Sequence, residues 1–171
     1  MNFKKINHAF IMAAGRGTRL MPLTRKVPKG LVKFKQSSLI ASGIKKLKRY
    51  IDFIHISVGY KGPILAKHLI EEKVSSIINT DKKGNSWWIF NSIFKSFDSP
   101  LYVLTCDNVT NIDFKKIEKD YYKKNQPLCM IVPTKPIKGL DGDYIFREKN
   151  IVQRLSRKDK SDIYCTGIQV L

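Results

Sequence analysis

The fold of this chain is decided by one stretch near its start, Ile11-Met12-Ala13-Ala14-Gly15-Arg16-Gly17-Thr18-Arg19-Leu20, followed by Met21-Pro22-Leu23-Thr24 and Val27-Pro28-Lys29-Gly30-Leu31-Val32. An apolar run over residues 8–12 leads into it, which is typical of a buried strand that enters a tight turn. Glycines let the backbone approach an anion, successive amide N–H groups form a nest for it, and arginines add positive charge. The stretch therefore indicates a phosphate-binding loop after the first strand.

Two familiar phosphate loops fit this stretch less well. The dinucleotide fingerprint requires a third glycine where Leu20 stands, and the P-loop requires a Gly-Lys-Ser/Thr ending that is missing. A Gly-x-Gly pair by itself is equally typical of a plain turn between a strand and a helix. The residues that follow the loop must therefore decide between these interpretations.

Hydrophobic periodicity predicts that strands and helices alternate over the first three-quarters of the chain. We expect strands at 8–12, 53–58, 74–78, 101–104 and 128–132, and helices at 39–51, 64–70, 88–97 and 114–121. Short strands without helices follow at 141–147, 151–155 and 164–171. Since parallel strands need crossover connections, the prediction is an α/β fold, doubly wound and Rossmann-like, whose mostly parallel, mixed sheet carries helices on both faces.

The expected ligand site lies at one edge of this sheet. Ligands of open α/β sheets bind beyond the carboxyl ends of the parallel strands. Gly15, Gly59 and Asp107 each follow an expected strand, so we expect all three at the same edge. Asp107 comes directly after Leu104-Thr105-Cys106, and a helix or turn cap is the alternative role for its carboxylate.

The chain is strongly basic, with 32 Lys and Arg against 14 Asp and Glu and a net charge of +18. Such a charge is compatible with a nucleic-acid partner, because lysines neutralise backbone phosphates. The lysines are scattered, however, and the run over residues 45–49 has helical spacing around an apolar residue, which is typical of a solvated helix face. We therefore expect no nucleic-acid partner, and the charge favours small anionic ligands.

Neither a membrane span nor a disulfide framework is expected. The longest apolar runs are far shorter than the roughly 20 residues that cross a bilayer, and the first ten residues do not read as a secretory signal. Cys106, Cys129 and Cys165 are widely spaced in or beside apolar segments, which predicts reduced, buried thiols. The three histidines lack metal-ligand spacing. These features indicate a cytoplasmic protein.

The run from Ile11 to Phe34 resembles the signature of the nucleotide-sugar pyrophosphorylases, a group of nucleotidyltransferases. In that group a strand is followed by a Gly-x-Gly-Thr-Arg-Leu loop, a Pro-Leu-Thr and a Pro-Lys. The resemblance implies a magnesium-dependent enzyme of nucleotide-sugar biosynthesis, which transfers a nucleoside monophosphate from a nucleoside triphosphate to a sugar 1-phosphate and releases pyrophosphate. Cytidylyltransferases that act on phosphocholine or a phosphonate share this signature, so the base and the acceptor stay open.

The resemblance assigns catalytic roles to three residues. Arg16 would bind the β- and γ-phosphates, Lys29 would bridge the α-phosphate and the acceptor phosphate, and Asp107 would hold Mg²⁺. An in-line attack on the α-phosphate needs positive charge at the leaving group and at both phosphates being joined. A single Asp can serve the metal when the triphosphate supplies the other ligands. The plain alternative for Lys29 is an exposed lysine after a proline.

The resemblance also implies residues that bind the nucleotide. The loop after the first strand and the loop after the third strand would contact the base, sugar and phosphates. The expected nucleotide-binding residues are Ala13, Ala14, Gly15, Gly17, Thr18, Asn79, Gly84, Asn85 and Ser86. For Asn85 and Ser86 an N-cap of the following helix is the alternative. Trp87 and Trp88 are expected to be core or lid residues.

An acceptor-binding set is expected near the end of the chain. The group carries a Glu-Lys-Pro in this region, which is absent here, and a Thr-Gly before a strand. Arg157 or Lys158 would replace the missing lysine. The expected acceptor-binding residues are Lys29, Arg157, Lys158, Thr166 and Gly167.

Residues 1–171 are expected to form a single nucleotidyltransferase domain that lacks the C-terminal part of the group. A second magnesium-binding carboxylate normally lies in that part. Asp141 and Asp143 have no match in the pattern, so no second metal ligand is assigned. A module that binds nucleotide without catalysis is therefore a second hypothesis, and a homo-oligomer stays open.

Overall fold

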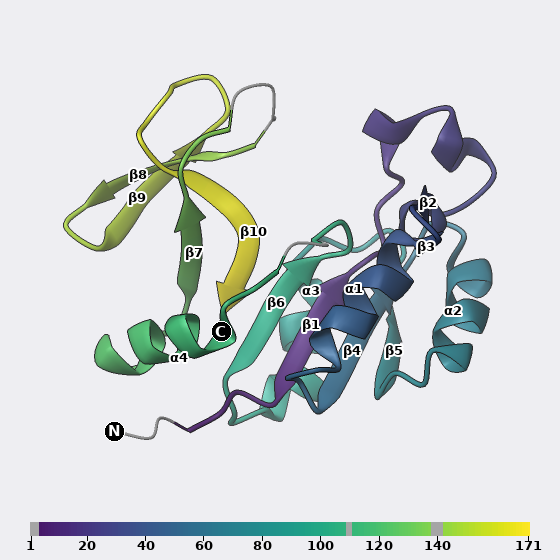
Figure 1. Ribbon diagram of the computed structural model, residues 1–171, viewed down its shortest axis with the longest axis horizontal. Helices are drawn as coiled ribbons and strands as arrows, with labels where there is room; N and C mark the ends of the chain where they lie inside the picture. Colours follow the sequence, from purple (N-terminus) through teal and green to yellow (C-terminus); the bar gives the residue numbers. More distant parts are fainter. Residues whose placement is uncertain (1–3, 109–110, 138–141) are drawn as a thin grey trace.

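An eight-stranded mixed sheet organises the molecule (Figure 1). This computed structural model describes residues 4–108, 111–137 and 142–171. The strand order is β5-β4-β1-β6-β10-β8-β9, and β7 pairs with β10 off this path. The strands are β1 (His8–Met12), β4 (Phe53–Val58), β5 (Ser76–Asn79), β6 (Leu101–Thr105), β7 (Met130–Thr134), β8 (Tyr144–Glu148), β9 (Ile151–Ser156) and β10 (Tyr164–Val170). A separate small ribbon pairs β2 (Lys33–Phe34) with β3 (Ser37–Ser38).

Four α-helices and four short 3₁₀ helices connect these strands within the described ranges. The α-helices are α1 (Leu39–Leu47), α2 (Gly62–Glu71), α3 (Trp87–Asn91) and α4 (Phe114–Lys123). The 3₁₀ helices are η1 (Thr18–Leu20), η2 (Leu23–Arg25), η3 (Lys29–Leu31) and η4 (Ile93–Ser96). Three of the 3₁₀ helices lie in the long connection after β1, which the sequence marks as irregular.

The sheet has a parallel half and an antiparallel half. Strands β5, β4, β1 and β6 are parallel, and Met12 at the end of β1 pairs with both Ser57 of β4 and Thr105 of β6. Strand β10 runs antiparallel to β6, β7 and β8, and β8 runs antiparallel to β9. The crossover helices occur where the sequence shows helical periodicity, and β8 and β9 are joined by a tight turn at residues 149–150. The predicted doubly wound, mixed α/β sheet is confirmed.

Helices cover both faces of the parallel half. Alternate residues of each strand face opposite sides, so each strand contributes to a core cluster on either face. Ala9 and Ile11 belong to the larger core cluster with apolar side chains of α1, α2 and α4. Phe10 belongs to a second cluster with Trp88 and Phe94 on the other face. Figure 1 shows α1 in front of the sheet and α3 behind it. The prediction of helices on both faces is therefore confirmed.

Two expected helices differ from the structure, one at its end and one in its interior. The helix expected over 39–51 ends at Leu47, and the one expected over 88–97 is interrupted at Ser92, whose backbone is extended (φ −137, ψ −169). The Ser92 hydroxyl donates to the Trp88 carbonyl at 2.5 Å and accepts from the Phe94 amide at 3.3 Å. Serine side chains compete with helical backbone hydrogen bonds in this way. Periodicity alone does not detect such a break.

The basic run over residues 45–49, at and just beyond the end of α1, is a solvated face, as predicted. Lys45, Lys48 and Arg49 are exposed, while Leu47 between them is buried. The side chain of Ser38 caps this helix, accepting a hydrogen bond from the Ala41 amide at 3.1 Å. No helix within the described ranges is long and apolar enough to cross a membrane.

The cysteines are all free thiols, but they are not all buried. Cys106 is buried, and burial raises the pKa of its thiol to about 11, so it stays protonated at neutral pH. Cys165 is partly buried and Cys129 is exposed. The prediction of a buried thiol is wrong for Cys129, because it lies in the connection before β7 rather than in the strand expected over 128–132.

Two histidines, His8 of β1 and His55 of β4, contact each other on neighbouring strands of the sheet. His55 is buried, its Nε2 lies 3.1 Å from Nδ1 of His8, and its Nδ1 lies 2.8 Å from the hydroxyl of Ser76. Burial lowers the pKa of His55 to about 4, and the charge of His8 acts in the same direction. The folded protein therefore keeps His55 neutral at neutral and mildly acidic pH.

This pair predicts a loss of stability in acid. The unfolded chain takes up a proton on His55 near pH 6.5, whereas the folded chain does so only near pH 4, so stability falls as the pH drops through this window. The loss amounts to about 3 kcal/mol at most. Urea unfolding at pH 7 and pH 4.5 measures it, and His55→Asn should flatten the dependence. An equally steep dependence in His55→Asn would contradict the assignment.

Candidate functional site

Two cavities adjoin at the carboxyl ends of the parallel strands. The first, of about 320 Å³, lies between the loop after β1, the loop after β5 and the end of β6. The second, of about 850 Å³, lies between the end of β6, α4, β7 and β10. Thr105 and Asp107 line both cavities, so the end of β6 forms the wall between them.

The loop after β1 is held in place by a glycine in a left-handed conformation. Gly17 has φ +64, and a Cβ atom there would lie 2.9 Å from Cβ of Lys29 and 3.1 Å from Cγ2 of Thr24. The hydroxyl of Thr24 donates to the Gly17 carbonyl at 2.9 Å. The loop therefore folds back against residues 24–29 at a distance that only glycine permits.

Replacement of this glycine is expected to destabilise the fold. Gly17→Ala should lower the free energy of unfolding by about 1–3 kcal/mol, because it adds both left-handed strain and a steric clash with Lys29. Gly15→Ala is the matched control, since a Cβ atom at Gly15 meets nothing within 4 Å and its φ is not positive. Urea unfolding of both variants checks this. Equal stability losses in the two variants would contradict the account of the loop.

The end of β4 also contacts this loop. A Cβ atom at Gly59 would lie 2.9 Å from both Cβ and the carbonyl oxygen of Ala14, and the Tyr60 amide donates to that carbonyl at 2.9 Å. The loop after β1, the end of β4 and the end of β6 are thus adjacent. Gly15, Gly59 and Asp107 lie at the same edge of the sheet, as predicted.

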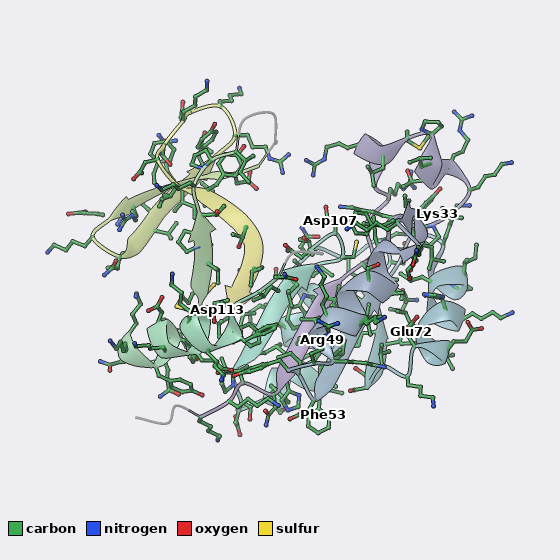
Figure 2. All side chains as sticks on the ribbon, in the orientation of Figure 1. Lys33, Arg49, Phe53, Glu72, Asp107 and Asp113 are labelled. Carbon is green, nitrogen blue, oxygen red and sulfur yellow. The ribbon has the colours of Figure 1, made fainter. Side chains whose placement is uncertain are left out.

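Lys29 and Asp107 meet at the junction of the two cavities. Nζ of Lys29 lies 2.7 Å from Oδ2 of Asp107, and the two side chains are 21% and 46% exposed. Burial alone would raise the pKa of Asp107, but the hydrogen bond and the charge of Lys29 outweigh it and hold that pKa below its ordinary value. Figure 2 shows Asp107 at the carboxyl end of the parallel strands and Asp113 apart from it. Asp113, rather than Asp107, caps α4 by accepting from the Lys116 amide.

Most of the residues expected at the nucleotide line the first cavity. From the expected set, the cavity is lined by Ala14, Gly15, Gly17, Thr18, Lys29, Gly84, Asn85 and Asp107. Thr166, expected at the acceptor, lines the second cavity. The expected residues that line neither are Ala13, Arg16, Asn79, Ser86, Arg157, Lys158 and Gly167.

A sequence model of the family described as Nucleotidyl transferase matches residues 8–162, which is most of the chain. The chain belongs to the nucleotidyl transferase family. The resemblance found in the loop after β1 is thereby confirmed over a much longer stretch.

The relatives of this chain differ in their named substrates. It is 27% identical over 171 residues to the mannose-1-phosphate guanyltransferase of Emericella nidulans, a match that covers 95% of this chain and 47% of that protein. Among solved structures, the CTP:phosphocholine cytidylyltransferase of Streptococcus pneumoniae has a TM-score of 0.71 at 25% identity, covering 95% of this chain and 69% of that one. The inositol-1-phosphate CTP transferase of T. maritima has a TM-score of 0.75 at 16% identity, covering 99% and 72%. The chain spans less than half of the length of the curated guanyltransferase.

Several of the expected residues make local contacts in the structure. Arg16 is exposed, with its guanidinium 5.7 Å from the centre of the Tyr60 ring. The side chain of Asn79 accepts a hydrogen bond from the Asp81 amide at 3.0 Å. Ser86 is the N-cap residue of α3, as the alternative expected, but its side chain makes no capping hydrogen bond.

The structure places the expected acceptor cations away from the second cavity. Arg157 and Lys158 follow β9, where Nε of Arg157 donates to Asp143 at 2.8 Å, and neither residue reaches the second cavity. The lysines that do line this cavity are Lys116 and Lys135. The cation was expected from its order along the chain, whereas the fold pairs β7 with β10 and brings both, with α4, to the second cavity.

Some residues of the first cavity were not expected from the sequence. Lys83 lies in the loop after β5 beside the expected Gly84, and Thr105 is the last residue of β6 before the expected Asp107. Their proximity in sequence to predicted residues was the available signal. Trp88 is buried, and its ring stacks on Phe10 with 3.7 Å between centres, so it is a core residue that also borders the cavity.

The site fits a magnesium ion only together with a triphosphate. Within the described ranges no group of three or more His, Cys, Asp and Glu residues forms a metal site. Of the described residues that line the first cavity, Asp107 is the one carboxylate, and its lowered pKa keeps it ionised. Its side chain is half-exposed. Magnesium is commonly held by one or two carboxylates with phosphate oxygens and water.

Proposed function

We propose that this nucleotidyl transferase transfers a nucleoside monophosphate from a magnesium-bound nucleoside triphosphate to a sugar 1-phosphate and releases pyrophosphate. The observation that carries the proposal is the contact between Lys29 and Asp107 at the wall between two cavities. One cavity is bordered by the glycine-rich loop and suits a triphosphate. The other is bordered by polar and cationic residues and suits a phosphorylated acceptor.

The proposed reaction joins the two ligands at this wall. An oxygen of the acceptor phosphate attacks the α-phosphorus, the bond from that phosphorus to the bridging oxygen breaks, and pyrophosphate leaves on the opposite side. Lys29 reaches the wall from η3 and would neutralise charge on both phosphates being joined. Mg²⁺, held by Asp107 and the triphosphate oxygens, would supply the remaining positive charge.

The leaving pyrophosphate requires a second source of positive charge. Arg16 and Arg19 belong to the loop after β1, and Arg19 lines the first cavity. Arg16 lies over Tyr60 at the surface, from where its long side chain would turn toward the β- and γ-phosphates. The amide groups of the loop would bind the same phosphates as a nest.

The second cavity favours an acceptor that carries several polar groups. Its walls include Lys116 and Lys135 as donors, together with the hydroxyl of Thr134. Donors and acceptors in one cavity suit the hydroxyl groups of a sugar as well as a phosphate. This composition supports the sugar 1-phosphate as acceptor.

A cytidylyltransferase that acts on phosphocholine is the second candidate. The same cavity also contains Asp113, Asp120 and the ring of Tyr164, which suit a quaternary ammonium group. The structural likeness to the phosphocholine cytidylyltransferase supports this candidate. A nucleotide-binding module without catalysis is the third.

A two-step assay separates these candidates. Thermal shifts with five Mg²⁺-bound triphosphates (ATP, GTP, CTP, UTP and dTTP) identify the base, and pyrophosphate release is then measured with mannose 1-phosphate, glucose 1-phosphate or phosphocholine. Release with either sugar phosphate supports the proposal, and release with phosphocholine alone supports the second candidate. Tight triphosphate binding without release from any acceptor would contradict both and favour the binding module.

A further inference from the structure

Two buried hydroxyl groups line the first cavity at the end that lies away from Asp107. Ser57 and Thr80 are 2% and 6% exposed, and both line this cavity. Ser57 belongs to β4 and Thr80 follows β5, whereas Asp107 follows β6. The strand order is β5-β4-β1-β6 (Figure 1), and neighbouring strands of a sheet lie about 4.8 Å apart. The end of β5 is therefore separated from the end of β6 by three strand spacings, or about 14 Å.

The hydroxyl group of Thr80 is held in place but has no partner. The Thr80 amide donates to the Val58 carbonyl at 2.8 Å, and the Thr80 carbonyl accepts from the Lys83 amide at 3.1 Å. Both backbone groups are therefore fixed. Within the described ranges the hydroxyl itself forms no hydrogen bond, although the residue is buried. An unpaired buried hydroxyl costs free energy, and in the wall of a cavity it indicates that a ligand supplies the partner.

The hydroxyl group of Ser57 has a hydrogen left to donate. Its oxygen accepts from the Ala13 amide at 3.1 Å, which joins β4 to the start of the loop after β1. In the part of the chain that the structure describes, no group accepts the hydrogen of this hydroxyl. The cavity wall thus offers a second hydrogen to a ligand.

A lysine completes this end of the cavity. Lys83 lines the cavity from the loop after β5, and its Nζ lies 5.3 Å from the centre of the Trp87 ring. The Trp87 amide donates to the Gly84 carbonyl at 3.1 Å, so the ring is tied to the same loop. Cations are attracted to the face of an aromatic ring. The contact with Trp87 therefore restricts where the ammonium group of Lys83 lies.

We propose that Thr80, Ser57 and Lys83 determine which base the site accepts, by donating hydrogen bonds to a carbonyl oxygen of that base. This inference rests on the proposed function, which assigns the phosphates to the loop after β1 and the metal to Asp107. A nucleotide bound in that way extends its base toward β4 and β5. The three side chains are then the specificity-determining residues of the nucleotide site.

The chemistry of this end of the cavity favours a carbonyl group over an amino group. An ammonium group only donates, and each hydroxyl has a hydrogen to donate, while the amide of Asn85 can both donate and accept. No carboxylate that could accept from an amino group lines this end within the described ranges. Guanine, cytosine, uracil and thymine carry carbonyl oxygens, whereas the exocyclic group of adenine is an amine that donates. The proposal therefore excludes ATP as the preferred triphosphate.

Affinities for five Mg²⁺-bound triphosphates test this specificity. Calorimetry of the full chain is performed with ATP, GTP, CTP, UTP and dTTP in the absence of an acceptor. The tightest ligand should be one of the four whose base has a carbonyl group, and ATP should bind about 10-fold more weakly or worse. Thr80→Val removes the hydroxyl with little change of shape and should weaken the tightest ligand by about 3- to 10-fold, which is the loss of one hydrogen bond. Its affinity for ATP should stay within about twofold of wild type.

Matched variants separate the hydroxyl and the charge from general effects on the loop. Thr80→Ser keeps the hydroxyl and should bind the tightest ligand within about twofold of wild type. Lys83→Met should weaken that ligand more than it weakens ATP. Lys82→Met is its control, because Lys82 is an exposed lysine of the same loop that lines neither the first nor the second cavity, and it should change each affinity by less than about twofold. Urea unfolding should show Thr80→Val at least as stable as wild type, since valine removes an unpaired buried hydroxyl.

The outcomes separate this inference from the proposed function. If ATP binds tightest, or if Thr80→Val weakens all five ligands equally, the specificity role is overturned, because the hydroxyl would then not act on the base. If wild type releases pyrophosphate but Thr80→Val binds the tightest ligand as wild type does, the inference fails while the function stands. If wild type prefers a base with a carbonyl group and Thr80→Val narrows that preference, but no acceptor yields pyrophosphate, the function fails and the inference stands. If none of the five triphosphates binds, both fail.

Discussion

Asp107→Ala is expected to reduce pyrophosphate release by about 1000-fold or more, because it removes the proposed protein ligand of Mg²⁺ from the wall between the cavities. Asp107→Asn should be nearly as damaging, since the amide keeps the shape of the side chain but loses its charge. A continuous pyrophosphate assay with saturating triphosphate and acceptor measures both. Retention of more than a tenth of wild-type activity in Asp107→Ala would exclude this residue as the metal ligand.

The loss of activity should not reflect a loss of fold. Asp107 is 46% exposed, and ion pairs of half-exposed side chains contribute about 1 kcal/mol or less to stability. Asp52→Asn is the matched control, because Asp52 also pairs with a lysine, at 2.9 Å from Lys5, but lies away from the cavities. This control should keep full activity, and all three variants should unfold at similar urea concentrations.

Lys29→Met is expected to lower turnover by about 100- to 1000-fold, which is the effect of removing one charged group that stabilises a developing phosphate charge. The methionine fills similar space without a charge, so the packing of η3 against the loop should persist. Because Lys29 is proposed to contact the acceptor phosphate, the KM for the acceptor should rise as well. Steady-state kinetics with each substrate varied in turn measures both effects.

A neighbouring lysine provides the control for Lys29. Lys33 is exposed in β2 and lines neither cavity, so Lys33→Met should change turnover by less than about twofold. Lys29→Arg keeps the charge but replaces a compact ammonium with a broad planar group. We expect it to recover only part of the activity. Equal activity of Lys29→Met and Lys33→Met would contradict the role of Lys29.

The parallel half of the fold and the loop after β1 could be predicted from the sequence, because they depend on local patterns. The apolar run at 8–12, the helical spacing in α1 and the Gly-x-Gly pair each act over a few residues. The common edge of Gly15 and Asp107 then follows from a rule about parallel sheets. The contact of Lys29 with Asp107 at 2.7 Å agrees with that expectation.

The second cavity could not be predicted in the same way, because it depends on how distant segments pack. Lys135 reaches the cavity because β7 pairs with β10, while Arg157 is drawn away by Asp143. The hydrogen bond from the Asn108 side-chain amide to the Gly167 carbonyl links residues 59 positions apart. Such contacts leave no periodic signal in the sequence.

The central claim is that the loop after β1 and the carboxylate of Asp107 take one metal-triphosphate between them. A crystal structure of the protein with Mg²⁺ and an α,β-methylene triphosphate tests it most directly. The account predicts phosphate density on the amide groups of residues 15–18, with the metal bound to Asp107 and Lys29 turned from that carboxylate toward the α-phosphate. A triphosphate bound away from this loop, or a metal with no contact to Asp107, would contradict it.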